Sequence, residues 1–181
     1  GDLLEHILGH RSPAMLFEDK LLYRAQLVRT GPSLPAHDVE MVGAAPGTAW
    51  CRVPGTDRSD FCLIAPGGVA PRVLEAATGA LSRGDIVADV AVPARLYPLD
   101  VDALASIARR AERTVVVEEG LPGSSWGSEV AHQLTKALWP LRHPVDVVTS
   151  RLSVIPSARH LESQVVVQAG DVLSLMERAH A

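Results

Sequence analysis

In about the last two thirds of the chain, short apolar runs alternate with longer amphipathic stretches. The runs are short and rich in β-branched residues, as expected of buried strands, while the stretches repeat their apolar positions with helical spacing. We predict strands at residues 61–65, 86–92, 114–117 and 145–148. We predict helices at residues 69–81, 101–111, 128–138 and 169–179. Such an alternation indicates an α/β domain with a mainly parallel sheet covered on both faces.

The first part of the chain follows a less regular pattern. Residues 2–8 read as a helix, and residues 14–17 as a short buried strand. The density of Pro and Gly in residues 31–54 favours a linker or an extended crossing segment. Within it we predict a strand at residues 50–53, which turns into the strand at 61–65 as its antiparallel neighbour.

The stretch TVVVEEGLPGSSWGSEVAHQL, residues 114–134, combines a buried strand, a Gly-rich turn and an amphipathic helix. Ligands and partners often gather at the carboxyl ends of strands in such sheets, so the loop 118–128 is our main candidate site. Glu118 and Glu119 could act as acid, base or hydrogen-bond acceptor, or could simply be solvated. Trp126 could serve a contact surface or could cover the core.

Three further features have a chemical and a structural interpretation. The turn at 65–68 could cradle a phosphate, but it lacks Gly-x-Gly-x-x-Gly spacing and also fits a tight turn before a helix. His6 and His10 have metal-compatible spacing without a third ligand nearby, so we expect a surface pair. The serines of the candidate loop lack the elbow motif of hydrolases, which argues against a nucleophile. These serines are Ser124, Ser125 and Ser128.

Composition narrows the classes of protein that fit. The 181 residues are 47% hydrophobic and 21% charged, which suits a compact globular domain. A net charge of −4 with dispersed basic residues argues against nucleic-acid binding. No apolar run is long enough for a membrane span, so we expect no membrane association. Cys51 and Cys62 form no metal pattern and suggest a reduced, cytoplasmic setting.

Several segments, taken in order, resemble the transketolase family. The similarity is closest to the carboxyl-terminal half of the beta subunit in the decarboxylating component of 2-oxo acid dehydrogenases, such as pyruvate or branched-chain dehydrogenase. The segments are RSPAMLFEDKLLYR (11–24), FCLIAPGGVAPRVLEAA (61–77), ARLYPLD (94–100), residues 114–134, and RLSVIPSARHLES (151–163).

This resemblance implies a three-layer α/β/α fold with a mixed, mostly parallel five-stranded sheet whose first strand is antiparallel. It divides the chain into residues 1–30, a remnant of the preceding pyrimidine-binding domain, a linker at 31–48, and a transketolase carboxyl-terminal domain at 49–181. We therefore expect the sequence to be a piece of a longer protein.

The resemblance also implies thiamine diphosphate and Mg²⁺ in the parent enzyme. The family's Gly-Asp-Gly motif with a distant Asn is absent, since the chain contains no Asn. The glutamate that activates the cofactor would precede Gly1. We therefore expect no catalytic, cofactor-binding or metal-binding residue here, no cofactor bound to this chain alone, and a chain that is inactive by itself.

The resulting functional prediction is a domain for subunit assembly and partner docking, while decarboxylation and acyl transfer to a lipoyl or carrier group belong to other domains. Expected partners are a second copy or an alpha-type, diphosphate-binding subunit, and a lipoyl acyltransferase or acyl carrier protein. The alternatives are a non-catalytic interaction module of the same fold and an unrelated nucleotide-binding domain. The residues expected at or near a partner surface are Glu118, Glu119, Gly120, Trp126 and Gly127.

Overall fold

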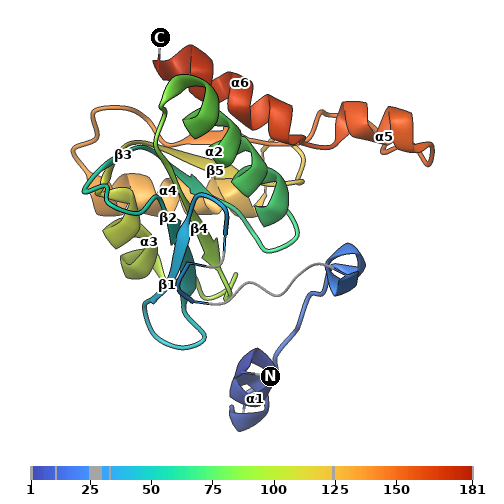
Figure 1. The fold of residues 1–181 in the computed structure, drawn as a ribbon. Coiled ribbons are helices and arrows are strands. Elements are labelled where there is room, and N and C mark those ends of the chain that lie inside the picture. Colours follow the sequence, from blue (N-terminus) through green and yellow to red (C-terminus); the bar gives the residue numbers. More distant parts are fainter. Residues whose placement is uncertain (1, 11, 25–29, 33, 124, 181) are drawn as a thin grey trace.

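The computed structural model describes residues 2–10, 12–24, 30–32, 34–123 and 125–180. Its centre is a six-stranded mixed sheet with helices on both faces (Figure 1). Helices α2 and α6 pack on one face, and α3 and α4 on the other. The strands are β1 (Asp38–Val42), β2 (Thr48–Arg52), β3 (Ser59–Ile64), β4 (Ala88–Pro93), β5 (Ala111–Val117) and β6 (Asp146–Val148).

The helices that cover the sheet match the amphipathic stretches of the sequence, with shifted ends. Two short helical segments, η1 and α5, were not predicted. No described helix is both long and apolar enough to cross a membrane. The helices are α1 (Asp2–Gly9), η1 (Lys20–Arg24), α2 (Ala70–Gly84), α3 (Val101–Ala108), α4 (Trp126–Leu138), α5 (Arg159–Val165) and α6 (Ala169–His180).

The sheet has the strand order β1-β2-β4-β3-β5-β6. Strands β4, β3, β5 and β6 are parallel, and Leu63 in β3 lies opposite Val90 and Val115 of its two neighbours. All three side chains are fully buried, as expected for parallel strands covered on both faces. The carboxyl ends of these strands meet at one edge, where the candidate loop begins.

The α/β fold class and the antiparallel start of the sheet are confirmed, and the sheet has six strands where we expected five. The predicted pairing of residues 50–53 with residues 61–65 is wrong, because β4 lies between β2 and β3. The antiparallel hairpin is instead β1–β2, closed by a turn in which Gly43 and Gly47 adopt positive φ.

Strand β1 lies inside the segment that we interpreted as a linker. Its sequence DVEMV alternates polar and apolar positions, and Val39 is buried in the core. The Pro and Gly residues around it belong to the turns that flank the strand. The division of the chain into three parts remains a prediction, with a strand in the middle part.

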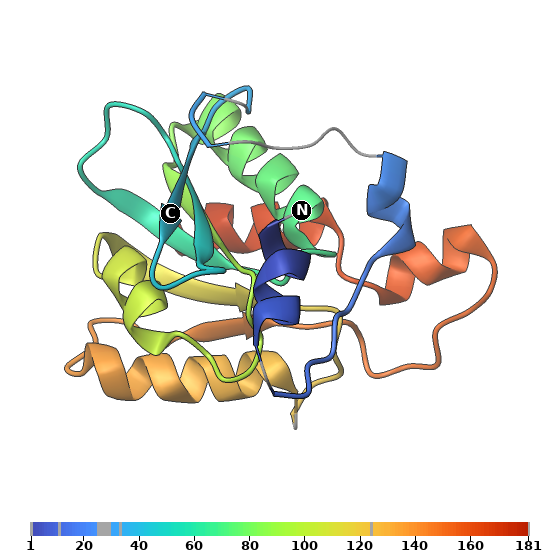
Figure 2. The same ribbon diagram turned by 90° about the horizontal axis from the view of Figure 1, so that it is seen from below.

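The expected buried strand at residues 14–17 is also absent. These residues are extended but exposed, with Met15 at 78% and Phe17 at 73%, and no described strand pairs with them. Residues 2–24, with residue 11 outside the description, are called the N-terminal arm here. Figures 1 and 2 show this arm running outside the sheet and its covering helices. Its apolar residues have no layer of this domain to pack on.

Candidate functional site

Glu118 occupies the point where β5 ends and the chain turns towards α4. Its residue exposure is only 5%, although it carries a carboxylate. The hydroxyl of Ser125, the residue before α4, donates a hydrogen bond to Glu118 Oε1. The amino end of α4 also carries a positive partial charge, which favours a carboxylate there. Glu118 is therefore buried with compensating partners.

Two glycines leave the space that this carboxylate needs. A Cβ atom on Gly127 would lie 2.7 Å from Glu118 Oε1 and 3.2 Å from a methyl group of Val147. A Cβ on Gly120 would lie 3.0 Å from Glu118 Oε2 and 3.1 Å from the Cβ of Ser125. The glycines of the loop thus allow the first turn of α4 to close on the carboxylate.

Backbone hydrogen bonds fix the same loop to the segment around β6. The Glu118 N–H donates to the Val148 carbonyl at 3.0 Å, and the Ser150 N–H donates to the Gly120 carbonyl at 3.1 Å. Glu118 and Gly120, the two residues that flank Glu119, are therefore both hydrogen-bonded to the segment around β6. This arrangement favours a structural role for Glu118 over that of an acid or base.

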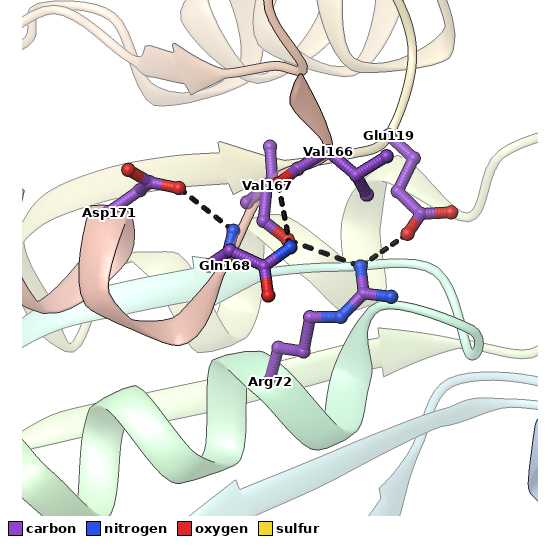
Figure 3. A network of polar contacts seen from close by, with 6 residues as sticks. All are labelled: Arg72, Glu119, Val166, Val167, Gln168 and Asp171. Atoms are coloured by element: carbon purple, nitrogen blue, oxygen red, sulfur yellow. Dashed lines mark hydrogen bonds and ion pairs between the residues drawn. The ribbon is translucent and has the colours of Figure 1, made fainter. Parts of the chain in front are cut away.

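Unlike the buried Glu118, its neighbour Glu119 lies at the surface. Its side chain is 46% exposed and forms an ion pair with Arg72 of α2. Arg72 Nη1 also donates to the Val167 carbonyl at 3.2 Å, just before α6 (Figure 3). One guanidinium therefore connects the candidate loop, α2 and the start of α6.

The segment that receives Arg72 is itself held by side chains at the start of α6. Gln168 Nε2 donates to the carbonyls of Val166 and Val167 at 2.7 and 3.2 Å. The Gln168 N–H donates to Asp171 Oδ2 at 2.9 Å, which satisfies a donor at the amino end of this helix (Figure 3). The network presents Arg72 and Glu119 in a fixed arrangement.

Trp126 begins α4 and is partly buried. Its ring packs against the core on the α3–α4 face, and its Nε1 donates to the Leu96 carbonyl at 3.2 Å. These contacts support the interpretation in which the indole covers the core. They also join the candidate loop to the segment that follows β4.

The structure brings the five predicted contact residues into one loop but gives them different exposures. Glu118 and Gly127 are buried within this chain, Gly120 and Trp126 are partly exposed, and Glu119 is exposed. The contact with a partner remains a prediction for all five. The outermost described residues of the loop are Leu121, Pro122 and Gly123, and Ser124 lies outside the described residues.

The turn at 65–68 is closed by the chain's own groups. The N–H groups of Val69 and Ala70 donate to the Pro66 carbonyl at 2.9 and 3.1 Å. The Asp19 carboxylate of the N-terminal arm lies so close that a Cβ on Gly68 would be 3.0 Å from its Oδ2. A phosphate at this turn would meet that negative charge, so the structure favours the tight-turn interpretation.

Sequence reasoning missed a polar cluster around Asp89 of β4. Asp89 is 2% exposed and accepts a hydrogen bond from the Trp50 indole at 3.1 Å. The guanidinium groups of Arg52 and Arg110 lie 5.1 and 5.0 Å from the Trp50 ring centroid. An aspartate inside the apolar run 86–92 was the available signal.

Burial controls the ionisation of the cluster and of the two cysteines. It raises the pKa of the Asp89 carboxyl, while the Trp50 hydrogen bond and the charge of Arg110 oppose the shift. Burial also raises the pKa of Cys51 to about 11 and that of Cys62 further, with Asp89 contributing in both cases. Both cysteines are free and protonated at neutral pH, which makes them poor nucleophiles and ligands.

The comparisons with known proteins agree with this architecture. Residues 53–172 match the family described as transketolase, C-terminal domain. The structure is similar to one described as "Split gene transketolase, inactive beta4 tetramer", with a TM-score of 0.55 and 28% identity over 67% of this chain and 39% of the other. This chain belongs to the transketolase C-terminal domain family.

Two curated relatives illustrate the range of proteins that contain a similar segment. The chain is 37% identical over 107 residues to 1-deoxy-D-xylulose-5-phosphate synthase 2 of Streptomyces avermitilis, which covers 59% of this chain and 16% of the relative. It is 29% identical over 118 residues to the acetoin:2,6-dichlorophenolindophenol oxidoreductase subunit beta of Bacillus subtilis, covering 65% and 34%. The chain therefore spans between about a sixth and a third of these relatives.

Proposed function

We propose that this chain is the carboxyl-terminal domain of a thiamine-diphosphate-dependent 2-oxo acid dehydrogenase or decarboxylase of the beta-subunit type. Its role in that enzyme is subunit assembly and partner docking. The family membership of residues 53–172 and the similarity to a subunit beta support this assignment. The observation that carries the docking role is the ion pair between Arg72 and Glu119, which lies at the surface directly after β5.

The physical basis of docking is that residues 118–120 are already held by contacts within the chain before a partner arrives. Glu118 is enclosed by Ser125 and by the first turn of α4, and Arg72 holds Glu119 from the opposite side. A surface that is already ordered loses little conformational entropy on binding. The partner is a second copy of the chain or an alpha-type subunit, with a lipoyl acyltransferase or acyl carrier protein as a further partner.

In this proposal thiamine diphosphate and Mg²⁺ bind outside the described residues, because carboxylates of the chain occupy the positions that would suit an anion. The carboxylate best placed for such a role, Glu118, is enclosed by Ser125 and the glycines. The turn best placed for a diphosphate faces the Asp19 carboxylate. The described residues contain no group of three or more potential metal ligands. In this proposal other segments hold the cofactor, which supplies the carbanion chemistry of decarboxylation.

Titration calorimetry of the purified chain with thiamine diphosphate and Mg²⁺ tests the cofactor part of the proposal. We expect no binding heat, because the anion-compatible positions are filled by carboxylates of the chain. Stoichiometric binding would contradict it. A chain mixed with its alpha-type subunit should bind the cofactor if that subunit carries the diphosphate site.

The docking part is tested with a pair of matched variants. Glu119→Gln removes the exposed negative charge that is paired with Arg72. Glu40→Gln removes the charge of a comparably exposed glutamate in β1, which is paired with Arg52 in β2. Sedimentation of the chain with the alpha-type subunit should show weaker association for Glu119→Gln only. Equal association of both variants would exclude the loop as the docking surface.

A second candidate function is a non-catalytic interaction module of the same fold. The parent open reading frame separates these possibilities. An upstream pyrimidine-binding domain supports an enzyme, whereas a start codon close to Gly1 supports the module.

A further inference from the structure

The N-terminal arm carries two histidines whose ring nitrogens point at each other. His6 lies in α1, and His10 follows the last residue of that helix. The Nε2 atoms of the two rings are 3.0 Å apart, and the ring centroids are 4.5 Å apart. The backbone N–H of His10 donates to the Ile7 carbonyl at 3.2 Å. This bond extends the final turn of the helix to His10 and keeps its ring beside that of His6.

This separation is the one that a shared metal ion requires. Imidazole nitrogens bind Zn²⁺ at about 2.0–2.1 Å, so two of them on one tetrahedral ion, or at cis positions of an octahedral one, lie about 2.9–3.4 Å apart. The observed 3.0 Å falls inside that range. An ion can therefore replace the hydrogen bond between the rings with little movement of either side chain.

The surroundings of the pair also suit a metal ligand. His6 is partly exposed and His10 is exposed, and none of the described ion pairs involves either residue. To bind one ion, both rings must be neutral and both Nε2 atoms must have a free lone pair. The ring that carries its proton on Nε2 meets this condition when the proton moves to Nδ1. Imidazole favours the later first-row divalent ions over Mg²⁺ and Ca²⁺, which prefer oxygen ligands.

We propose that His6 and His10 form a two-histidine site for a divalent transition ion, with Cu²⁺ and Ni²⁺ as the best fits and Zn²⁺ as a weaker one. Water completes the coordination sphere, since the described residues offer no third nitrogen, sulfur or carboxylate ligand in a group with this pair. The site lies on the arm outside the sheet (Figure 1), so it is independent of the docking loop. The proposal goes beyond our expectation from the sequence, which was a surface pair without a metal.

The test is calorimetry with Ni²⁺ and electron paramagnetic resonance with Cu²⁺ on the full chain. We expect one ion per chain, with nitrogen hyperfine structure from two imidazoles. His6→Gln and His10→Gln should each weaken binding by about tenfold or more, because the second ligand is no longer held near the first. The control is the double variant His132→Gln with His160→Gln, two exposed histidines, which should bind as the parent chain does.

A further variant keeps the number of histidines constant while separating the two rings. In Leu8→His combined with His10→Gln, the ligands are two residues apart on a helix and face different sides. This variant should bind as weakly as His10→Gln. Parent-like affinity in it, or an equal loss in the His132 and His160 control, would overturn the proposal. Unchanged binding in His6→Gln would do the same.

Discussion

Gly127 is the residue whose lack of a side chain matters most at the candidate site. Gly127→Ala would place a Cβ 2.7 Å from Glu118 Oε1 and 2.9 Å from its Cδ, so the first turn of α4 would have to shift. We expect the free energy of unfolding to fall by about 2 kcal/mol, the usual cost of overpacking a filled site. Urea denaturation followed by far-UV circular dichroism measures this change.

Gly170 provides the control for that substitution. It lies near the start of α6, and a Cβ there meets nothing within 4 Å. Gly170→Ala should therefore leave stability unchanged or raise it by up to about 1 kcal/mol. Equal destabilisation by both substitutions would mean that helix propensity, and not the space around Glu118, governs the result.

Asp89 gives stability a dependence on pH. Burial raises its pKa, so the folded protein holds this proton more tightly than the unfolded chain does. The resulting stabilisation is present at low pH and is lost as the pH rises through the folded-state pKa. Relative to Asp89→Asn, which keeps an acceptor for the Trp50 indole, the parent chain should lose stability as the pH rises from about 4, the ordinary pKa of an aspartate, through the raised folded-state pKa.

Urea denaturation at several pH values measures this difference. Asp57→Asn is the control, because it makes the same substitution at an exposed aspartate. A difference between the parent chain and Asp89→Asn that stays constant with pH would contradict the assignment of Asp89 as a buried acid.

At the scale of single residues, sequence predicted positions better than contacts. Glu118, Gly120 and Gly127 were identified as one loop from the Gly-rich turn after a strand. Their contact depends on how closely α4 approaches β5, which no local pattern encodes. The same limit applies to Asp89 and Trp50, which lie 39 residues apart and meet only because β2 pairs with β4.

Among the elements, α3 begins at an N-cap aspartate, Asp100. The Asp100 side chain accepts a hydrogen bond from the Ala103 N–H at 3.0 Å. Asp100→Ala should lower the free energy of unfolding by about 1 kcal/mol, the typical value of an N-cap. Asp100→Asn retains an oxygen acceptor and should cost much less. Thermal melts of the two variants compare the losses.

The strand pattern explains why some elements were predicted and others were not. The central parallel strands β3, β4 and β5 each contain a buried apolar run between helices, and this signal is strong because both of their faces are covered. Strand β1 contains two acidic residues and is bordered by Pro and Gly, so turn residues obscured it. Residues 14–17 gave the opposite error, since an apolar run predicts burial but does not supply the neighbouring strand.

At the scale of the whole molecule, the N-terminal arm exposes apolar side chains. Leu4 is 50% exposed, Leu8 76% and Phe17 73%, so one short segment presents several large apolar side chains to solvent. Exposed apolar patches often mark interaction surfaces. We expect the purified chain to self-associate through the arm. Light scattering should report a mass above that of one chain, which falls towards the monomer in Leu8→Ser combined with Phe17→Ser.

Tyr97 is the control for this effect, because it is 91% exposed on the sheet domain and not on the arm. Tyr97→Ser should leave the association unchanged. A monomeric parent chain whose residues 12–24 are protected from hydrogen exchange would contradict the prediction. It would show that the arm is ordered without any contact to a second copy.

The position of β4 between β2 and β3 has a consequence for the order of assembly. Strand β3 follows β2 in the chain but does not pair with it, because the place between them belongs to β4. This place stays empty until the chain has passed through α2 and added β4. The β1–β2 hairpin can therefore dock only after the parallel centre exists, and long-range pairings of this kind form late. In pulsed hydrogen exchange during refolding, the amides of Trp50 and Cys51 should gain protection after those of Leu63 and Val115.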